Sequence, residues 1–170
     1  MSEPPAHRPI RKRIRLAGYD YNTPGYYFAT ICTKEKRKLL CEIVGTGGLD
    51  GPDVRFTAYG EIAQKHLDEM SAFYPDLLVE KYVIMPNHIH LLIHILGCGS
   101  GPSRTPVPTN SKISMFVSTF KWFCNKEYGQ NIWQSRSHDH VIRNEQDYSK
   151  IWEYIENNPR KWADDCFFIE

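Results

Sequence analysis

The sequence lacks a long uninterrupted hydrophobic run. Its most apolar stretch extends from Tyr82 to Leu96 and is broken by Pro86, Asn87 and three histidines. A helix needs about 20 consecutive apolar residues to cross a bilayer, so this stretch cannot do so. The first residues are polar and rich in proline, and no hydrophobic segment follows their basic run as a signal peptide would require. We therefore expect a cytoplasmic protein with no membrane partner.

Cysteines are few, and they are scattered along the chain. The five of them are odd in number, and no two have the spacing of metal ligands. This pattern predicts free buried thiols rather than a disulfide framework or a thiolate metal site.

Net charge is also small, at +1, but its distribution is uneven. The first 40 residues carry nine Lys/Arg and three Asp/Glu, whereas the rest of the chain carries twelve and seventeen. Part of this excess forms a compact basic arm near the start of the chain, and such an arm suits binding to a phosphate backbone. The alternative is that these charges belong to an ordinary solvated terminus. The DNA-binding candidates in this arm are Arg11, Lys12, Arg13 and Arg15.

The 170 residues, 41% of them hydrophobic and 13% aromatic, predict one folded domain over residues 1–170. We expect it to carry a basic N-terminal arm (1–20) and a mobile loop (97–110) rich in glycine and proline. Apolar periodicity predicts helices over 60–74, 111–128 and 145–158, the last capped by Asn144. Strands are predicted over 26–32, 39–44, 54–58, 77–85, 88–93 and 138–142. This order predicts an α+β fold with helices packed on one face of a largely antiparallel sheet.

Two histidines one residue apart, His88 and His90, lie within the apolar stretch. On a strand this spacing puts both imidazoles on one face, while the aliphatic residues between and after them fill the other. Polar rings on a buried strand cost free energy unless something satisfies them, and a divalent metal ion does so. Since two ligands do not define a metal site, hydrogen-bonded structural histidines remain the alternative. His94 continues the same face and is expected outside the ligand set.

The predicted last helix presents two polar side chains at the edge of its apolar stripe. Tyr154 and Asn158 are four residues apart and therefore point the same way. If they share a cleft with both histidines, the imidazole nitrogens and the Asn158 oxygen can hold a divalent ion that polarises a phosphodiester. Tyr154 can then attack phosphorus. The phosphotyrosine conserves the energy of the broken bond, so strand rejoining needs no nucleotide cofactor.

Several segments carry a resemblance to a known family. The segment from Met85 to His90 resembles the histidine-hydrophobic-histidine motif of the single-tyrosine HUH transposases, and the run from Tyr154 to Trp162 resembles the nucleophile helix of their REP-associated tyrosine transposase branch. Further blocks that resemble the family occur, in the family's order along the chain, at residues 11–21, 27–33, 133–134 and 140–143. The chain departs from the family at residues 135–138, where an aromatic pair is usual, and in the loop 97–110.

This resemblance implies a ferredoxin-like fold, Mg²⁺ or Mn²⁺ as cofactor, and cleavage of single-stranded DNA, often beside a hairpin. It implies Tyr154 as the catalytic nucleophile, with His88, His90 and Asn158 as metal ligands. It also implies a homodimer, because members of the family are commonly dimeric. In some members the tyrosine helix of one subunit completes the site of its partner. We therefore expect a metal-dependent single-stranded DNA endonuclease and strand transferase that forms a phosphotyrosine intermediate.

Two other functions stay open. One is a domesticated module that binds hairpin DNA without cleavage, and the other is a metal-dependent hydrolase that uses a water nucleophile. Asp147 shares the helix edge with Tyr154 and Asn158, so it is a candidate to orient a metal-binding histidine by a hydrogen bond to its other ring nitrogen. Its negative charge near the helix N-terminus, which stabilises the helix, is the alternative explanation. His138 and His140 form a second alternating pair, for which no third ligand is evident.

Overall fold

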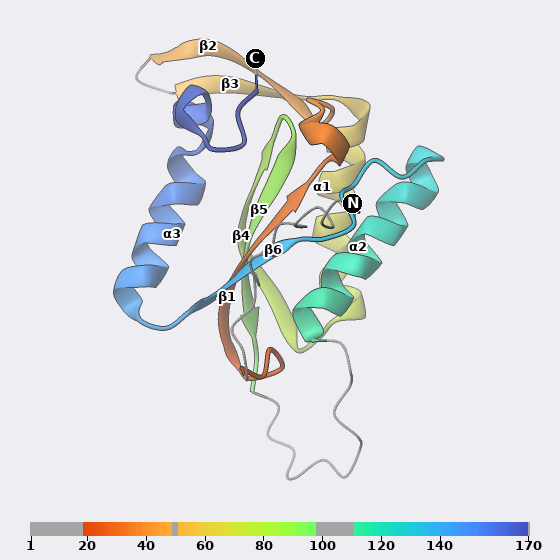
Figure 1. Ribbon diagram of the computed structural model, residues 1–170, viewed down its shortest axis with the longest axis vertical. Helices are drawn as coiled ribbons and strands as arrows, with labels where there is room; N and C mark the ends of the chain where they lie inside the picture. The colour runs from red at the N-terminus through yellow and green to blue at the C-terminus, as the bar shows by residue number, and fades with distance from the viewer. Residues whose placement is uncertain (1–18, 49–50, 98–110, 170) are drawn as a thin grey trace, which may run out of the picture.

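The computed structural model describes residues 19–48, 51–97 and 111–169 (Figure 1). A four-stranded antiparallel sheet has the order β4-β5-β1-β6. Its strands are β1 (Gly25–Cys32), β4 (Leu77–Met85), β5 (His88–Ile95) and β6 (His138–Ile142). A separate hairpin consists of β2 (Cys41–Gly48) and β3 (Gly51–Phe56). The helices are α1 (Ala58–Phe73), α2 (Lys112–Tyr128) and α3 (Glu145–Asn157), with short 3₁₀ turns η1 (Lys34–Lys36) and η2 (Pro159–Asp164).

The connection β1-α1-β4-β5-α2-β6 is the split βαβ arrangement of ferredoxin-like folds. Strand β5 lies between β1 and β4, so the chain leaves β1, crosses over through α1 and returns to the far side of β5. The predicted α+β class and antiparallel sheet are confirmed. The hairpin β2–β3 is inserted before α1, as the glycine-rich loop indicated.

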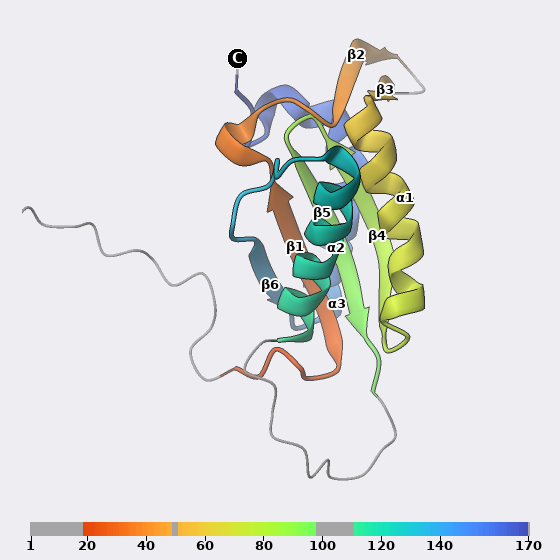
Figure 2. The ribbon, with the colours of Figure 1, turned by 90° about the vertical axis from the view of Figure 1, so that its right-hand side faces the viewer.

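The predicted position of the helices differs from the structure in one respect. Helices α1 and α2 cover one face of the sheet, whereas α3 lies on the opposite face (Figures 1 and 2). The reason is that β1 and β5 are buried on both faces. Ala29 and Leu91 belong to the core beneath α1 and α2, while Leu92 packs with Ile155 of α3.

Each helix begins at a side chain that satisfies a free backbone amide. Thr57 accepts from the amide of Gly60, Ser111 from that of Ser114, and Asn144 from that of Asp147. The predicted Asn144 cap is therefore confirmed. Because Thr57 caps α1, β3 ends at Phe56, and the second hairpin strand begins and ends earlier than its predicted range (54–58).

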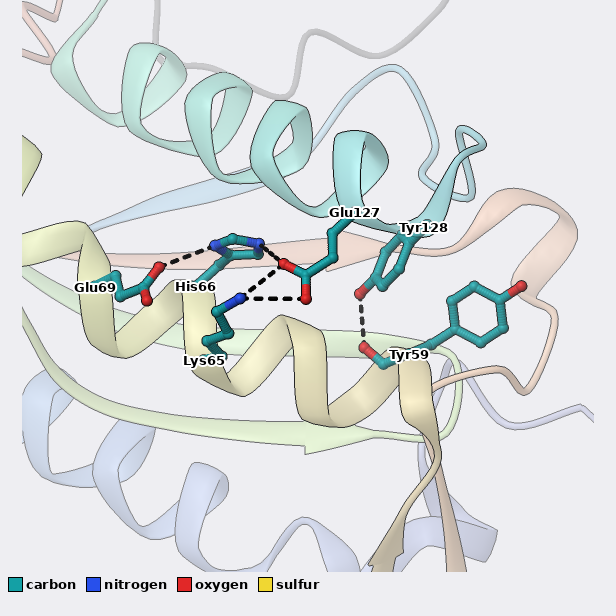
Figure 3. Close-up of polar contacts among 6 residues, drawn as sticks. All are labelled: Tyr59, Lys65, His66, Glu69, Glu127 and Tyr128. Atoms are coloured by element: carbon teal, nitrogen blue, oxygen red, sulfur yellow. Dashed lines mark hydrogen bonds and ion pairs between the residues drawn. The ribbon is translucent and has the colours of Figure 1, made fainter.

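A polar cluster joins α1 to α2 on the outer side of the helical layer (Figure 3). His66 contacts Glu69 through Nδ1 at 3.2 Å and Glu127 through Nε2 at 2.9 Å. Lys65 also donates to Glu127. These contacts hold the two helices together on the side of the sheet away from α3.

Some predictions concern residues that the structure does not describe. The basic arm with Arg11, Lys12, Arg13 and Arg15 lies outside the described residues, and so does the loop from residue 98 to 110. Within the described ranges, no helix combines the length and apolar character needed to span a membrane.

Candidate active site

The two histidines lie at the start of β5, directly after the turn at Pro86 and Asn87. They pair with β1 in the register Cys32 to His88 and Thr30 to His90. Both side chains point to the α3 face, and their ring centroids are 4.4 Å apart. His88 is 0% exposed and His90 is 1% exposed. The predicted shared face is confirmed.

Asn87 fixes the orientation of the His88 ring. The Asn87 amide nitrogen donates to the carbonyl oxygens of Lys36 at 3.1 Å and Phe167 at 2.8 Å. Its Oδ1 therefore faces Nδ1 of His88, at 2.8 Å, and can only accept. Nδ1 of His88 carries the proton, and its buried Nε2, which has no hydrogen-bond partner among the described residues, keeps a lone pair for a ligand.

His90 is held at both ring nitrogens. Its Nδ1 lies 2.8 Å from the hydroxyl of Thr30 on the neighbouring strand, and its Nε2 lies 3.2 Å from the hydroxyl of Tyr154. Thr30 is itself buried. The strand pair β1–β5 thus aims the Nε2 atom of His90 at the tyrosine of α3.

Tyr154 and Asn158 meet at one carboxylate. The Tyr154 hydroxyl donates to Oδ2 of Asp165 at 3.0 Å, and the Asn158 amide donates to the same oxygen at 2.9 Å. Asn158 is 2% exposed, whereas Tyr154 is 39% exposed. The predicted common direction of the two side chains is therefore seen, and Tyr154 is much more exposed to solvent than Asn158.

Burial determines the protonation of the site. It lowers the pKa of His88 to about 4, against the opposing effect of the Asp165 charge, and it lowers the pKa of His90 well below the usual value. Burial, with the negative charge of Asp165 next, raises the pKa of the Tyr154 hydroxyl well above its usual value. Near neutral pH the site therefore holds neutral imidazoles and a protonated tyrosine.

These groups fit a divalent metal ion. Ligand atoms of His88, His90 and Asp165 all lie within 4.8 Å of one another. The buried Oδ1 of Asn158 has no hydrogen-bond partner among the described residues, as is the case for Nε2 of His88. Two neutral imidazoles with carboxylate and amide oxygens form a donor set for a first-row or hard divalent cation.

Asp147, a candidate from the sequence, does orient a histidine, but a different one. Its carboxylate contacts Nε2 of His140 on β6 at 2.8 Å, where α3 begins. This contact corrects the expectation that Asp147 supports a site histidine. His94 lies outside the site as predicted, since it stacks on Tyr26 with ring centroids 4.1 Å apart and contacts Glu80 at 3.2 Å.

The sequence analysis missed three residues of this site: Thr30, Asn87 and Asp165. Asn87 directly precedes the histidine motif, and this position is the sequence signal that indicates its role in the site. Thr30 is paired with His90 only through the sheet register. Asp165 follows η2 and belongs to no periodic pattern, so only the return of the chain toward β5 reveals it. The following Phe167 ring lies 4.6 Å from the His88 ring, centroid to centroid.

A hollow of about 280 Å³ opens beside Tyr154 on the outer side of α3 and η2. Its lining includes Tyr154, Asn158 and Asp165, the two cations Lys150 and Lys161, and the carboxylates of Glu153 and Asp164. Both lysines are exposed. The phenol is therefore presented to an open space whose lining carries charges of both signs.

Comparison with known proteins gives one relative and one solved structure of note. An uncharacterized protein of Haemophilus influenzae is 30% identical over 175 residues, which cover 94% of each chain. The structure of a REP-associated tyrosine transposase bound to a REP hairpin superposes with a TM-score of 0.61 and 21% identity, covering 88% of this chain and 75% of the other. No family model matches the sequence. The chain therefore belongs to the same family as the Haemophilus influenzae protein, and it has the fold of the REP-associated tyrosine transposase that its sequence resembles.

Proposed function

We propose that this protein is a metal-dependent endonuclease and strand transferase for single-stranded DNA, with Tyr154 as the nucleophile. The observation that carries the proposal is the contact of the Tyr154 hydroxyl with both His90 and Asp165, beside Nε2 of His88, for which the described part of the chain offers no hydrogen-bond partner. The fold of a transposase bound to a DNA hairpin supports it. We propose hairpin-flanked single strands as substrate and the arm from Arg11 to Arg15 as a contact to their backbone.

His88, His90, Asn158 and Asp165 would hold a Mg²⁺ or Mn²⁺ ion. Such an ion supplies Lewis-acid polarisation of the phosphate oxygens. Asp165 lies where it can accept the proton of Tyr154 as the phenol oxygen attacks phosphorus. Since burial and this carboxylate keep the resting tyrosine protonated, attack requires that the proton leave in the transition state.

The reaction exchanges one phosphoester for another. The bond from the Tyr154 oxygen to phosphorus forms as the bond to the leaving oxygen of the strand breaks, and the released strand ends in a hydroxyl that takes up a proton. Attack of a strand hydroxyl on the phosphotyrosine then reverses the exchange and frees Tyr154. The number of phosphoester bonds is unchanged, so strand rejoining needs no nucleotide cofactor.

The test is to incubate wild type, Tyr154→Phe and Tyr148→Phe with labelled hairpin-flanked single strands and Mn²⁺, and to resolve the products on a denaturing gel. Tyr148 is the matched control, because its hydroxyl donates to Glu80 and not to the site. We expect protein-linked DNA with wild type and Tyr148→Phe and none with Tyr154→Phe. If wild type and Tyr154→Phe both cleave the strands without forming protein-linked DNA, the nucleophile is water. If wild type binds the hairpin but does not cleave, the protein is a DNA-binding module.

A further inference from the structure

The turn that follows β1 places four cations at the rim of the candidate active site. Lys34, Lys36, Arg37 and Lys38 surround one acidic residue, Glu35. We call residues 34–38 the basic turn. Lys34, Arg37 and Lys38 are exposed, and Lys36 is half-buried.

The backbone of the basic turn is held in an unusual conformation. Glu35 and Lys36 have φ angles of 56° and 54°, in the left-handed region that residues other than glycine rarely adopt. The turn is fixed from both sides, since the Lys34 amide donates to the carbonyl of Ile132 at 2.7 Å and the Thr33 hydroxyl donates to that of Arg37 at 2.8 Å. Such a conformation persists only where its surroundings determine it. The four side chains are therefore presented from an anchored backbone, which limits the entropy lost when they bind a ligand.

One residue connects the basic turn to the metal-ligand candidates. The Asn87 amide donates to the carbonyl of Lys36 at 3.1 Å, while its oxygen faces Nδ1 of His88 at 2.8 Å. On the other side, Nζ of Lys36 donates to the carbonyl of Cys166 at 3.2 Å, next to Asp165. The basic turn is thus connected to His88 through Asn87, and it approaches Asp165 through the contact of Lys36 with the neighbouring Cys166.

The exposed cations of the turn are not neutralised within the described part of the chain. Lys34 and Arg37 form no ion pair there, and Lys38 lies over the Phe168 ring at 5.4 Å. On the α3 side of the site, Lys150 and Lys161 line the hollow beside Tyr154 together with the carboxylates of Glu153, Asp164 and Asp165, so the charges there are mixed. The exposed cations of the basic turn favour an anionic ligand that extends from the site across this turn, as a nucleic acid strand does.

We propose that the basic turn binds backbone phosphates of the single strand whose cleavage is proposed above, next to the phosphate that Tyr154 attacks. The inference rests on that proposed function. Lys34 and Arg37 make the phosphate contacts, because Lys36 and Lys38 are already engaged with the C-terminal segment. Recognition by charge alone makes this contact independent of base sequence.

The experiment is fluorescence anisotropy with a labelled hairpin that carries a single-stranded flank, in EDTA so that no cleavage occurs, over a series of salt concentrations. The test variant is Lys34→Gln/Arg37→Gln. The control is Lys65→Gln/Lys126→Gln, which removes two exposed cations from the helical layer; Figure 3 shows Lys65 there. We expect the test variant to bind roughly tenfold more weakly at low salt and to lose about 1.4 from the slope of log affinity against log salt, since each single-strand phosphate contact contributes about 0.7.

The control variant and the charge-conserving Lys34→Arg/Arg37→Lys should bind as wild type does. Circular dichroism verifies folding, and if the double variant does not fold, each single variant should lose about 0.7 from the slope. Affinity and slope equal to wild type in Lys34→Gln/Arg37→Gln would overturn this inference and leave the proposed function intact. Failure of the wild-type protein to bind the labelled DNA would overturn both.

Discussion

Tyr154 donates a hydrogen bond of 3.0 Å to Asp165, a residue beyond the end of its helix. An oxygen of the same carboxylate lies within 4.8 Å of ring nitrogens of His88 and His90, so the three side chains could hold one metal ion. We therefore expect Asp165→Asn to weaken Mn²⁺ binding at least tenfold and to slow formation of the tyrosine adduct, because the substitution removes the negative charge from the donor set. Isothermal titration with Mn²⁺ measures the first effect without any turnover.

Asp164→Asn is the matched control for this substitution. Asp164 is the preceding carboxylate and also lines the hollow beside Tyr154, but it is not in the cluster of ligand atoms. If both variants bind Mn²⁺ as wild type does, Asp165 is not a ligand and its role is confined to Tyr154.

Thr30→Val should weaken Mn²⁺ binding about tenfold with little change in fold. Valine keeps the β-branched shape that the strand prefers, but Nδ1 of His90 loses the hydroxyl at 2.8 Å that orients its ring. Thr119→Val, which removes a hydroxyl hydrogen-bonded to Tyr74 on the helical layer, is the control. Equal Mn²⁺ affinity for wild type and both variants would show that Thr30 does not orient the ligand.

Without metal, the free energy of unfolding should decrease in acid. Burial holds the pKa of His88 at about 4 and that of His90 well below the usual value, whereas the unfolded chain protonates both at about 6.5. Below that pH the unfolded state binds more protons, so stability is complete above about pH 6.5 and is lost as pH falls toward 4. Each histidine contributes a slope of about 1.4 kcal/mol per pH unit.

Urea unfolding in EDTA across this pH range measures the slope. His88→Gln should make it shallower, because one buried titratable group is gone. Ser71→Ala, at an exposed position of α1, removes no titratable group and should leave the slope as it is. A slope that is the same in all three proteins would show that the His88 imidazole is not held neutral by burial.

Gly60→Ala should destabilise the fold by about 1–3 kcal/mol, although alanine is the better helix former by about 1 kcal/mol. A Cβ atom at Gly60 would lie 2.0 Å from the carbonyl oxygen of Leu40, where the first turn of α1 meets the start of the hairpin. Ser71→Ala, at an exposed position of the same helix, is the control. Urea unfolding compares the variants, and a more stable Gly60→Ala protein would contradict the close packing.

Much of the fold could be predicted because its signals are local. The turn at Pro86 and Asn87, the cap at Asn144 and the alternation around His88 each act over a few residues, and the structure has the corresponding elements. The side of the sheet on which α3 packs could not be predicted. The apolar stripe containing Ile155 shows that one face of this helix is buried, but it does not show which face of the sheet the helix packs against.

The sequence by itself determined that His88 and His90 share a face and that Tyr154 and Asn158 point together, since strand and helix periodicities are properties of the local backbone. Only the tertiary structure brought these pairs to one place and added Thr30, Asn87 and Asp165 to them. It also placed Lys34 and Arg37, four and seven residues after Thr30, beside the same site. Such contacts join residues far apart in the chain, and they depend on sheet register and on the path of the chain after α3, which no local pattern encodes.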